Sequence, residues 1–260
     1  MISVKLPLQS SIITVMTKAA IKASKGLLRD FSELENLQVS VKSNRTFVTS
    51  ADIRANKILM EELTHARPTY SLLSEEAKEI VGSDPEYRWI IDPLDGTNNY
   101  MHGFPHWAIS IALEKNSEVI AAVTYDPVKN ELFWAEKGYG AYVNDKKIRV
   151  SGKKDLIDLL VSCGHLDETG MNWISTYQNS IRRTGSMALD MAYVAAGRID
   201  LMFSAYRKNN IWDVAAGMLL IKEAGGIIAS KDGKITNDYN EVTIMTNIDV
   251  LSSLINRKVG

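Results

Sequence analysis

The sequence predicts an α+β fold, in which an N-terminal α+β half with an antiparallel sheet is followed by a C-terminal α/β half. Strand-like segments at 108–113, 119–125 and 132–135 follow one another with only turn residues between them, which is typical of an antiparallel meander. From about residue 159, strand-like and helix-like segments alternate instead. We therefore expect one compact unit, with an α+β lobe over residues 1–150 and an α/β lobe over residues 151–260.

Helical patterns open the first half. Apolar residues at helical spacing between Leu8 and Leu34 predict a long helix that ends near Asp30. Residues 38–45 alternate and then become polar, which predicts a strand and an exposed loop. A second helix is expected after Thr49, because Thr49 and Asp52 fit a capping box. The other expected elements of this half are a strand at 70–73, a polar loop at 78–86, a buried strand at 89–91 and a β segment from Gly138 to about Val150.

The second half is expected to alternate between the two element types. Ser186 and Gly197 have the residue types that begin and end helices, which predicts a helix over 186–196. The remaining expected elements are strands at 159–163, 199–203, 227–229 and 242–246, a short helix or turn at 173–179, and helices at 213–223 and 248–257.

Composition excludes several classes of protein. The chain has 260 residues, 45% of them hydrophobic and 23% charged, as in ordinary globular proteins. A net charge of −1 lacks the basic excess of a nucleic-acid-binding surface. No apolar run approaches the roughly 20 residues that a membrane helix needs. The N-terminus lacks a secretory pattern, and Cys163 is the only cysteine, so we expect a cytoplasmic protein without disulfides.

The most informative stretch is Asp92-Pro93-Leu94-Asp95-Gly96-Thr97-Asn98-Asn99-Tyr100, directly after the buried strand. Its two carboxylates are hard oxygen ligands at a strand end. Pro93 takes the chain out of the ladder, which frees the Leu94 carbonyl as a further oxygen ligand. The amides after Asp95 can face an anion. A turn is the alternative for an isolated Asp-Gly pair, but Glu75 after another strand and Asp213 at a helix start add carboxylates that would repel unless cations bind them.

Residues Asp92 to Tyr100 resemble the signature of the inositol monophosphatase family, Asp-Pro-(Ile/Leu)-Asp-Gly-Thr, one variable residue, Asn and an aromatic residue. Three further matches follow the family's order, Thr49-Ser50-Ala51-Asp52, Ser74-Glu75-Glu76 and Trp212-Asp213-Val214-Ala215-Ala216-Gly217. The resemblance spans about residues 42–228 and implies an αβαβα layered sandwich. It also implies an Mg²⁺-dependent phosphoric monoester hydrolase that is inhibited by Li⁺ and forms a homodimer.

The resemblance implies a site with two Mg²⁺ ions. The first ion would be held by Glu75, Asp92, the Leu94 carbonyl and Thr97, and the second by Asp92, Asp95 and Asp213. Glu76 is a candidate for a third metal site, or equally a solvated partner of Lys78. Asp52 and Thr97 would form a relay that takes a proton from the attacking water, although Asp52 also fits a capping role. The residues implied as catalytic are Asp52, Thr97 and Glu75, and those implied to bind phosphate or substrate are Asp95, Gly96, Thr97, Asn98, Gly185, Ser186, Lys42 and Arg207.

Substrate choice follows from the same resemblance. Asn98-Asn99-Tyr100 and the Gly185-Ser186 segment favour inositol 1-phosphate, a small polyol phosphate. The chain departs from bacterial members in having no acidic residue between Asp200 and Asp213. The basic residues Arg207 and Lys208 there are either solvated or accept a second anionic group of the substrate. Fructose 1,6-bisphosphatase or a broad sugar phosphatase is the alternative enzyme, and a regulatory or binding protein that keeps the fold is the alternative of another class. Lys42 is likewise either a phosphate-side lysine or a solvated one.

Overall fold

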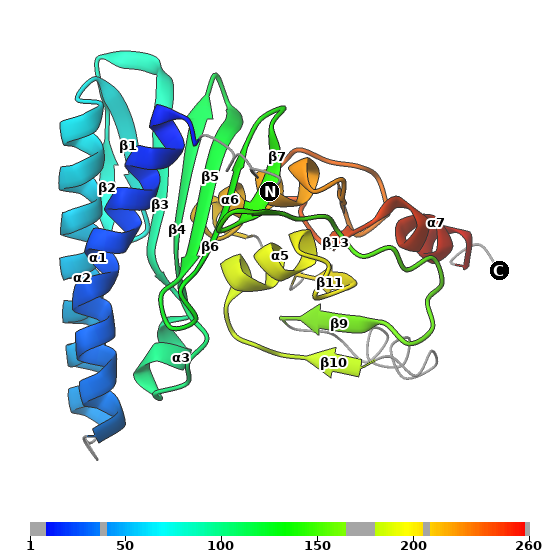
Figure 1. Ribbon diagram of the computed structural model, residues 1–260, viewed down its shortest axis with the longest axis horizontal. Helices are drawn as coiled ribbons and strands as arrows, with labels where there is room; N and C mark the ends of the chain where they lie inside the picture. Colours follow the sequence, from blue (N-terminus) through cyan, green and yellow to red (C-terminus); the bar gives the residue numbers. More distant parts are fainter. Residues whose placement is uncertain (1–8, 37–40, 165–179, 205–208, 258–260) are drawn as a thin grey trace, which may run out of the picture.

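Five layers of helices and sheets make up the molecule, in the order α, β, α, β, α (Figure 1). The computed structural model describes residues 9–36, 41–164, 180–204 and 209–257, and at 34–36, 41–49 and 257 it describes the backbone only. The outer layer on one side consists of α1 (Ser11–Asn36) and α2 (Val41–Ala66), which lie side by side. The central helical layer consists of α5 (Met187–Ala195) and α6 (Ile211–Glu223), and α7 (Ile248–Arg257) covers the far side. The predicted α+β layered fold is confirmed.

The first sheet has eight strands in the order β2-β1-β3-β4-β5-β6-β7-β8. Its strands from β3 onward form the predicted antiparallel meander, whereas β1 runs parallel to β3. The bounds are β1 (Tyr70–Ser74), β2 (Ala77–Ile80), β3 (Asp84–Asp95), β4 (Ala108–Lys115), β5 (Glu118–Asp126), β6 (Glu131–Glu136), β7 (Gly140–Val143) and β8 (Lys146–Lys147).

Both faces of this sheet are covered by helices, which explains why its central strands are apolar throughout. Successive side chains of a strand point to opposite faces. Trp89 and Ile91 on β3 therefore pack with α1 and α2, while Ile90 between them packs with α5 and α6. The second hydrophobic cluster joins residues of the first sheet to residues of the second half of the chain, Ala112 and Leu220 among them.

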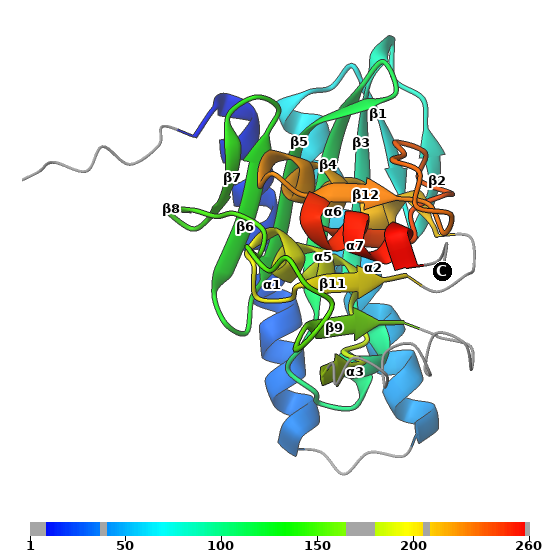
Figure 2. The same ribbon diagram turned by 90° about the vertical axis from the view of Figure 1, so that its right-hand side faces the viewer.

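The second sheet has five strands in the order β10-β9-β11-β13-β12. Strands β10, β9 and β11 are parallel, and β13 pairs antiparallel with β11 and β12. Figure 2 shows this sheet with α7 on its outer side, where Val250, Leu251 and Leu254 pack onto it. The bounds are β9 (Leu160–Cys163), β10 (Ser180–Arg182), β11 (Leu201–Phe203), β12 (Ile227–Ala229) and β13 (Ile244–Thr246).

Three local predictions are wrong. The first helix was expected to end near Asp30, but α1 continues to Asn36. The strand expected at 38–45 is helical from Val41, so Lys42 and Thr49 lie inside α2 and Thr49 is no helix cap. Packing of α2 along α1 outweighs the β propensity of this segment. The loop expected at 78–86 instead contains β2, paired with β1 as a hairpin, and the start of β3. The helix or turn expected at 173–179 lies outside the described residues.

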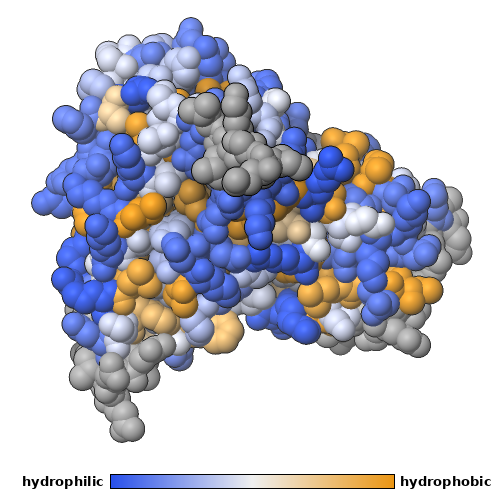
Figure 3. Space-filling model, in the orientation of Figure 1, coloured by the Kyte–Doolittle hydropathy of each residue, from blue (hydrophilic) through white to orange (hydrophobic). Residues whose placement is uncertain are grey.

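The surface is mostly hydrophilic on the face seen in Figure 3, with hydrophobic side chains in separate small patches. Among the helices that the structure describes, none combines the length and the apolar character needed to cross a membrane.

Candidate active site

Parallel pairing of β1 with β3 brings two of the predicted carboxylates together. Ser74, the last residue of β1, lies opposite Ile91, and the Glu75 amide donates to the Ile91 carbonyl at 3.2 Å. Glu75 therefore leaves β1 beside Asp92 of β3, because parallel strands end at the same edge of a sheet. The Ser74 hydroxyl donates to Asn56 Oδ1 of α2 at 2.7 Å, which fixes this strand end against the helical layer.

The Asp92–Asp95 segment leaves the sheet through an irregularity. The pairing of β3 with β4 shifts register between Asp92 and Asp95, at the place where Pro93 has no amide to donate. The Leu94 amide donates to Asp92 Oδ1 at 3.0 Å. Gly96 follows with φ +88°, and a Cβ there would lie 3.0 Å from the His106 carbonyl oxygen. Only glycine fits this turn into the short helix α3 (Thr97–Met101) without strain.

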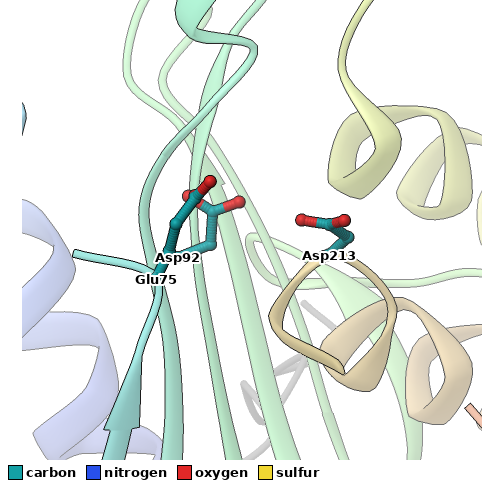
Figure 4. Close-up of side chains that lie close together, drawn as sticks. All are labelled: Glu75, Asp92 and Asp213. Carbon is teal, nitrogen blue, oxygen red and sulfur yellow. The ribbon is translucent and has the colours of Figure 1, made fainter. Parts of the chain in front are cut away.

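Asp213 reaches the same point from the other half of the chain. It lies in the first turn of α6, and Figure 4 shows its carboxylate facing Glu75 and Asp92. Carboxylate oxygens of these three residues lie within 4.8 Å of one another. Asn210, just before α6, donates to Asp213 Oδ2 at 3.3 Å. Three carboxylates at this separation are suited to a hard divalent cation.

Asp95 lies nearby, but its carboxylate is held by the start of α5. It accepts hydrogen bonds from the hydroxyl of Ser186, from the Ala188 amide at 2.9 Å and from the Met187 amide at 3.3 Å. Ser186 is the N-cap of α5, as predicted, and also accepts from the Leu189 amide at 3.3 Å. Asp95 is therefore outside the three-residue cluster, and its role as a metal ligand stays a prediction.

The electrostatics of the site are dominated by uncompensated negative charge. Burial, and then the charges of Asp95, Glu75, Asp213 and Asp52, raise the pKa of Asp92 well above its ordinary value. Burial also raises the pKa of Asp95 to about 7, although the Ser186 hydroxyl opposes this. The pKa values of Glu75 and Asp213 are raised too, in both cases chiefly by burial. None of the basic side chains that the structure describes forms an ion pair with these carboxylates.

Asp52 and Thr97 do not form the predicted direct relay in this structure. The Thr97 hydroxyl donates to the Leu94 carbonyl at 3.0 Å. Asp52 is 4% exposed, and its Oδ1 has no hydrogen-bond partner among the described residues. Burial and the charges of Glu76 and Glu75 raise the pKa of Asp52 to about 8. Asp52 lies within α2, so its carboxylate is not needed at a helix start and is available to the site.

The other predicted substrate residues are placed in different ways. Gly185 has φ +84° and lies beside the motif, since a Cβ on it would be 2.9 Å from Asn99 Oδ1. Asn98 is exposed in the first turn of α3. Lys42 belongs to α2 rather than to a loop, and its side chain lies outside the described part. Arg207 also lies outside the described residues.

Some residues of the site were not predicted from the sequence. The Asn99 amide group donates to the carbonyls of His106 and Thr184, both at 2.7 Å, and so joins the motif to the segment before α5. Asp190, within α5, is buried and accepts hydrogen bonds from two hydroxyls. The signal for Asp190 was a lone carboxylate in the otherwise apolar run Met187–Ala195, because such a group is seldom buried without partners.

Comparison with known proteins decides the family. The inositol monophosphatase family matches residues 8–258. The chain belongs to the inositol monophosphatase family. It is 46% identical over 234 residues to a Rhizobium meliloti protein named inositol-1-monophosphatase, covering 86% of this chain and 87% of that protein. It is also 43% identical over 237 residues to a Xylella fastidiosa protein named Nus factor SuhB, covering 87% of this chain and 84% of that protein.

Solved structures agree with this membership. The extragenic suppressor protein SuhB of Bartonella henselae superposes with a TM-score of 0.85 at 39% identity, covering 97% of this chain and 100% of that one. The inositol monophosphatase of Anabaena sp. superposes with a TM-score of 0.81 at 31% identity, covering 96% of this chain and 95% of that one. The resemblance stated from four short motifs is confirmed, and with it the assignment to the phosphoric monoester hydrolases.

Proposed function

We propose that this protein is an Mg²⁺-dependent phosphatase that hydrolyses a small polyol or sugar phosphate monoester, with inositol 1-phosphate as the leading substrate. The observation that carries the proposal is the convergence of Glu75, Asp92 and Asp213 within 4.8 Å without a compensating basic group in the described part. Family membership and the relatives named inositol-1-monophosphatase support the phosphate ester as substrate.

The donor set fits magnesium. Carboxylate and carbonyl oxygens are the ligands that Mg²⁺ prefers, and no sulfur or imidazole ligand belongs to this cluster. Glu75, Asp92 and Asp213 would hold the metal, with the Leu94 carbonyl, Asp95 and Thr97 as the further ligands expected from the family. Bound Mg²⁺ supplies a Lewis acid that polarises the phosphoryl group and makes water a better nucleophile.

The residues of the chain then have separate tasks. The amides of Gly96 and Thr97, at the open start of α3, would hold the phosphate oxygens. Asp52 can accept a proton at Oδ1, which is buried and has no hydrogen-bond partner among the described residues, and its raised pKa makes its carboxylate a stronger base than an exposed one. The Gly185-Ser186 segment would contact the polyol, because Asn99 places it next to the phosphate-binding turn.

Phosphate release by the purified protein tests the proposal. Inositol 1-phosphate, fructose 1,6-bisphosphate and adenosine 3′,5′-bisphosphate are compared with Mg²⁺, with a chelator, and in the Asp95→Asn variant. We expect Mg²⁺-dependent turnover that is highest on inositol 1-phosphate, lost in the variant and inhibited by Li⁺. A preference for fructose 1,6-bisphosphate would instead favour the sugar bisphosphatase alternative. Absence of turnover on all three substrates with Mg²⁺ bound would contradict a phosphatase function.

A second candidate is a regulatory protein that retains the fold. The observation that favours it is the relatives named Nus factor SuhB, which are 35–43% identical to this chain. Retention of the whole acidic cluster favours catalysis over this alternative. A strain that carries only the Asp95→Asn variant separates the two: a regulatory role survives the loss of turnover, whereas a purely catalytic role does not.

We also propose a homodimer, which is expected from the family resemblance. Light scattering after size exclusion measures it directly, since the chain mass is 28.9 kDa. A mass near a single chain at micromolar concentration would contradict this proposal.

A further inference from the structure

The segment Thr184–Ser186 connects β10 to α5 and carries the residue that holds Asp95. Ser186 donates its hydroxyl to the Asp95 carboxylate, and the first amides of α5 add two more hydrogen bonds to the same group. Asp95 therefore takes its position from the start of α5. Anything that moves this segment also moves the partners of Asp95.

Asp190 holds the segment from inside the fold. It lies one helical turn after Ser186, with its amide donating to the Ser186 carbonyl at 3.1 Å, and it is 4% exposed. Its Oδ1 accepts from the Thr184 hydroxyl at 2.6 Å, and its Oδ2 accepts from the Ser162 hydroxyl of β9 at 2.5 Å. His106 Nε2 lies 3.8 Å from Oδ1. The carboxylate thus folds the segment back onto α5 and ties it to the second sheet.

The Thr184 carbonyl is fixed from the opposite side by Asn99 of α3, at 2.7 Å. Thr184 therefore lies between Asn99 and Asp190. Its carbonyl accepts a hydrogen bond from Asn99, and its hydroxyl donates one to Asp190. The positive φ of Gly185 turns the chain from this anchored residue to Ser186. The two hydrogen bonds of Thr184 and the three of Ser186, with Asp95, Leu189 and Asp190, determine where the segment lies.

We propose that Asp190 is a positioning residue, which acts through Thr184 to set the Thr184–Ser186 segment and hence the hydrogen bonds from Ser186 and α5 to Asp95. Asp190 lies outside the cluster of Glu75, Asp92 and Asp213 and would act through its hydrogen-bond partners. The inference rests on the proposed phosphatase function, because the hydrogen bonds of Asp190 would serve to place Asp95 and the Thr184–Ser186 segment for that reaction. Displacement of a reacting group by about 1 Å through a remote change can cost roughly 100-fold in rate.

The two hydroxyls on Asp190 allow a matched experiment. Thr184→Val removes the hydrogen bond between Thr184 and Asp190 with little change in side-chain size. Ser162→Ala removes the hydrogen bond between Ser162 of β9 and the same carboxylate. Thr184→Ser restores the hydroxyl, and Thr184→Ala serves as the second variant if valine prevents folding. For each protein we would measure kcat and KM on the substrate that the wild type hydrolyses best, the Mg²⁺ affinity by calorimetry, and the Tm.

The expected result separates position from stability. Thr184→Val should lower kcat/KM about 10–100-fold and weaken Mg²⁺ binding, whereas Ser162→Ala should lower the Tm and keep kcat/KM within about threefold of the wild type. Thr184→Ser should restore both activity and Mg²⁺ affinity. Wild-type kcat/KM and Mg²⁺ affinity in Thr184→Val, or equal kinetic losses in Thr184→Val and Ser162→Ala, would overturn the inference.

Failure of the proposed function gives a different pattern. If the wild type releases no phosphate, that function is wrong, and the Mg²⁺ affinities then decide the inference alone. Weaker Mg²⁺ binding by Thr184→Val than by Ser162→Ala supports the positioning role, and equal affinities overturn it.

Discussion

Two groups of buried carboxylates in this molecule have opposite electrostatic surroundings. Asp30, 3% exposed between α1 and α2, pairs with Arg54 at 2.5 Å and with Arg29 at 2.9 Å. Asp92, 1% exposed at the end of β3, has only acidic neighbours among the groups that shift its pKa. Both carboxylates lose water on folding, and burial of a charge is costly unless it is paired. The chain supplies the counter-charge at Asp30, whereas none of the described basic residues pairs with Asp92.

Two other buried carboxylates, Glu114 and Asp126, follow the Asp30 pattern. Glu114 pairs with Arg88 at 2.7 Å, and Asp126 pairs with Lys129 at 2.8 Å. Asp190 is buried without a lysine or arginine partner in the part of the chain that the structure describes, but two hydroxyls donate to it. Among the described residues, Asp92 differs from all of these carboxylates because acidic groups surround it. This difference supports the proposed metal site, in which a cation from solution would supply the missing counter-charge and offset the cost in stability.

The largest expected effect comes from removing one site charge. Asp92→Asn should lower kcat/KM by about 1,000-fold or more, because loss of a charged ligand forfeits several kcal/mol of transition-state stabilisation at about 1.4 kcal/mol for each factor of ten. Steady-state kinetics at saturating Mg²⁺ measures the loss. Asp126→Asn is the control, because Asp126 is a buried carboxylate that pairs with Lys129. A loss of activity of the same size in that variant would show that the carboxylates without a basic partner are no more important for activity than the paired ones.

The next largest effect is expected at Asp52 of α2, whose pKa is raised by burial and by the charges of Glu76 and Glu75. Asp52→Asn should lower kcat about 100-fold, the usual contribution of a general base. Retention of full kcat with an unchanged pH–rate profile would rule out a role for Asp52 in proton transfer.

Asp52 also makes stability depend on pH. A carboxyl group with a raised folded-state pKa binds more protons in the native state, so its contribution is fully present below the unfolded value of 3.8 and is lost as pH rises toward about 8. In chelator, the free energy of unfolding should therefore decline across this range, and less steeply in Asp52→Asn. Urea titrations at several pH values measure the slopes, and parallel curves for the two proteins would show that Asp52 is not perturbed.

A smaller effect is expected at the compensated carboxylate. Asp30→Asn should cost about 2 kcal/mol of stability, because charge-assisted hydrogen bonds to two arginines are weakened, while kcat stays unchanged. For a chain of this size, this corresponds to a fall in Tm of about 4–8 °C. Thermal unfolding and steady-state kinetics on the same preparation test it. Loss of kcat without loss of Tm would place Asp30 in the functional group and not in the structural one.

The smallest effect on stability is expected for an ion pair at the surface. Lys22→Ala removes an exposed ion pair with Glu62, in which the lysine side chain is 57% exposed. Such pairs contribute about 0–1 kcal/mol, so the Tm should change little. A loss as large as that of Asp30→Asn would show that burial does not control the value of an ion pair in this protein.

Much of the fold followed from local patterns. The meander of β4 to β6 was predictable because its strands are short, apolar and separated by turn residues, and the helix capped by Ser186 because its first and last residues have strong end preferences. The start of α2 was not predictable, because Val39 and Val41 favour a strand locally while contact with α1 decides the outcome. The hairpin partner β2 was missed because its residues are polar and lie at the edge of the sheet.

The site residues also divide into those that local sequence could predict and those that only the fold reveals. The motif residues Asp92 to Thr97 could be recognised because they are contiguous in sequence. Asn99 and Asp190 act through hydrogen bonds to Thr184, which is 85 and 6 residues away along the chain. The lone carboxylate in an apolar run indicated that Asp190 has partners, but which residues these are is decided only by the fold. The direct Asp52–Thr97 relay was expected from the family, whereas the Thr97 hydroxyl here donates to Leu94.

Thermal stability tests most directly whether the site carboxylates bind a cation, by comparing the wild type with Asp92→Asn in chelator and in Mg²⁺. In chelator, Asp92→Asn should be more stable than the wild type, because it removes a buried acidic group whose pKa is raised by burial and by four neighbouring carboxylates. With Mg²⁺ at about 100 times its Kd, the wild type should gain about 2.7 kcal/mol and become the more stable protein. A wild type that is more stable than Asp92→Asn in chelator and gains nothing from Mg²⁺ would contradict the claim that these carboxylates are placed for a cation.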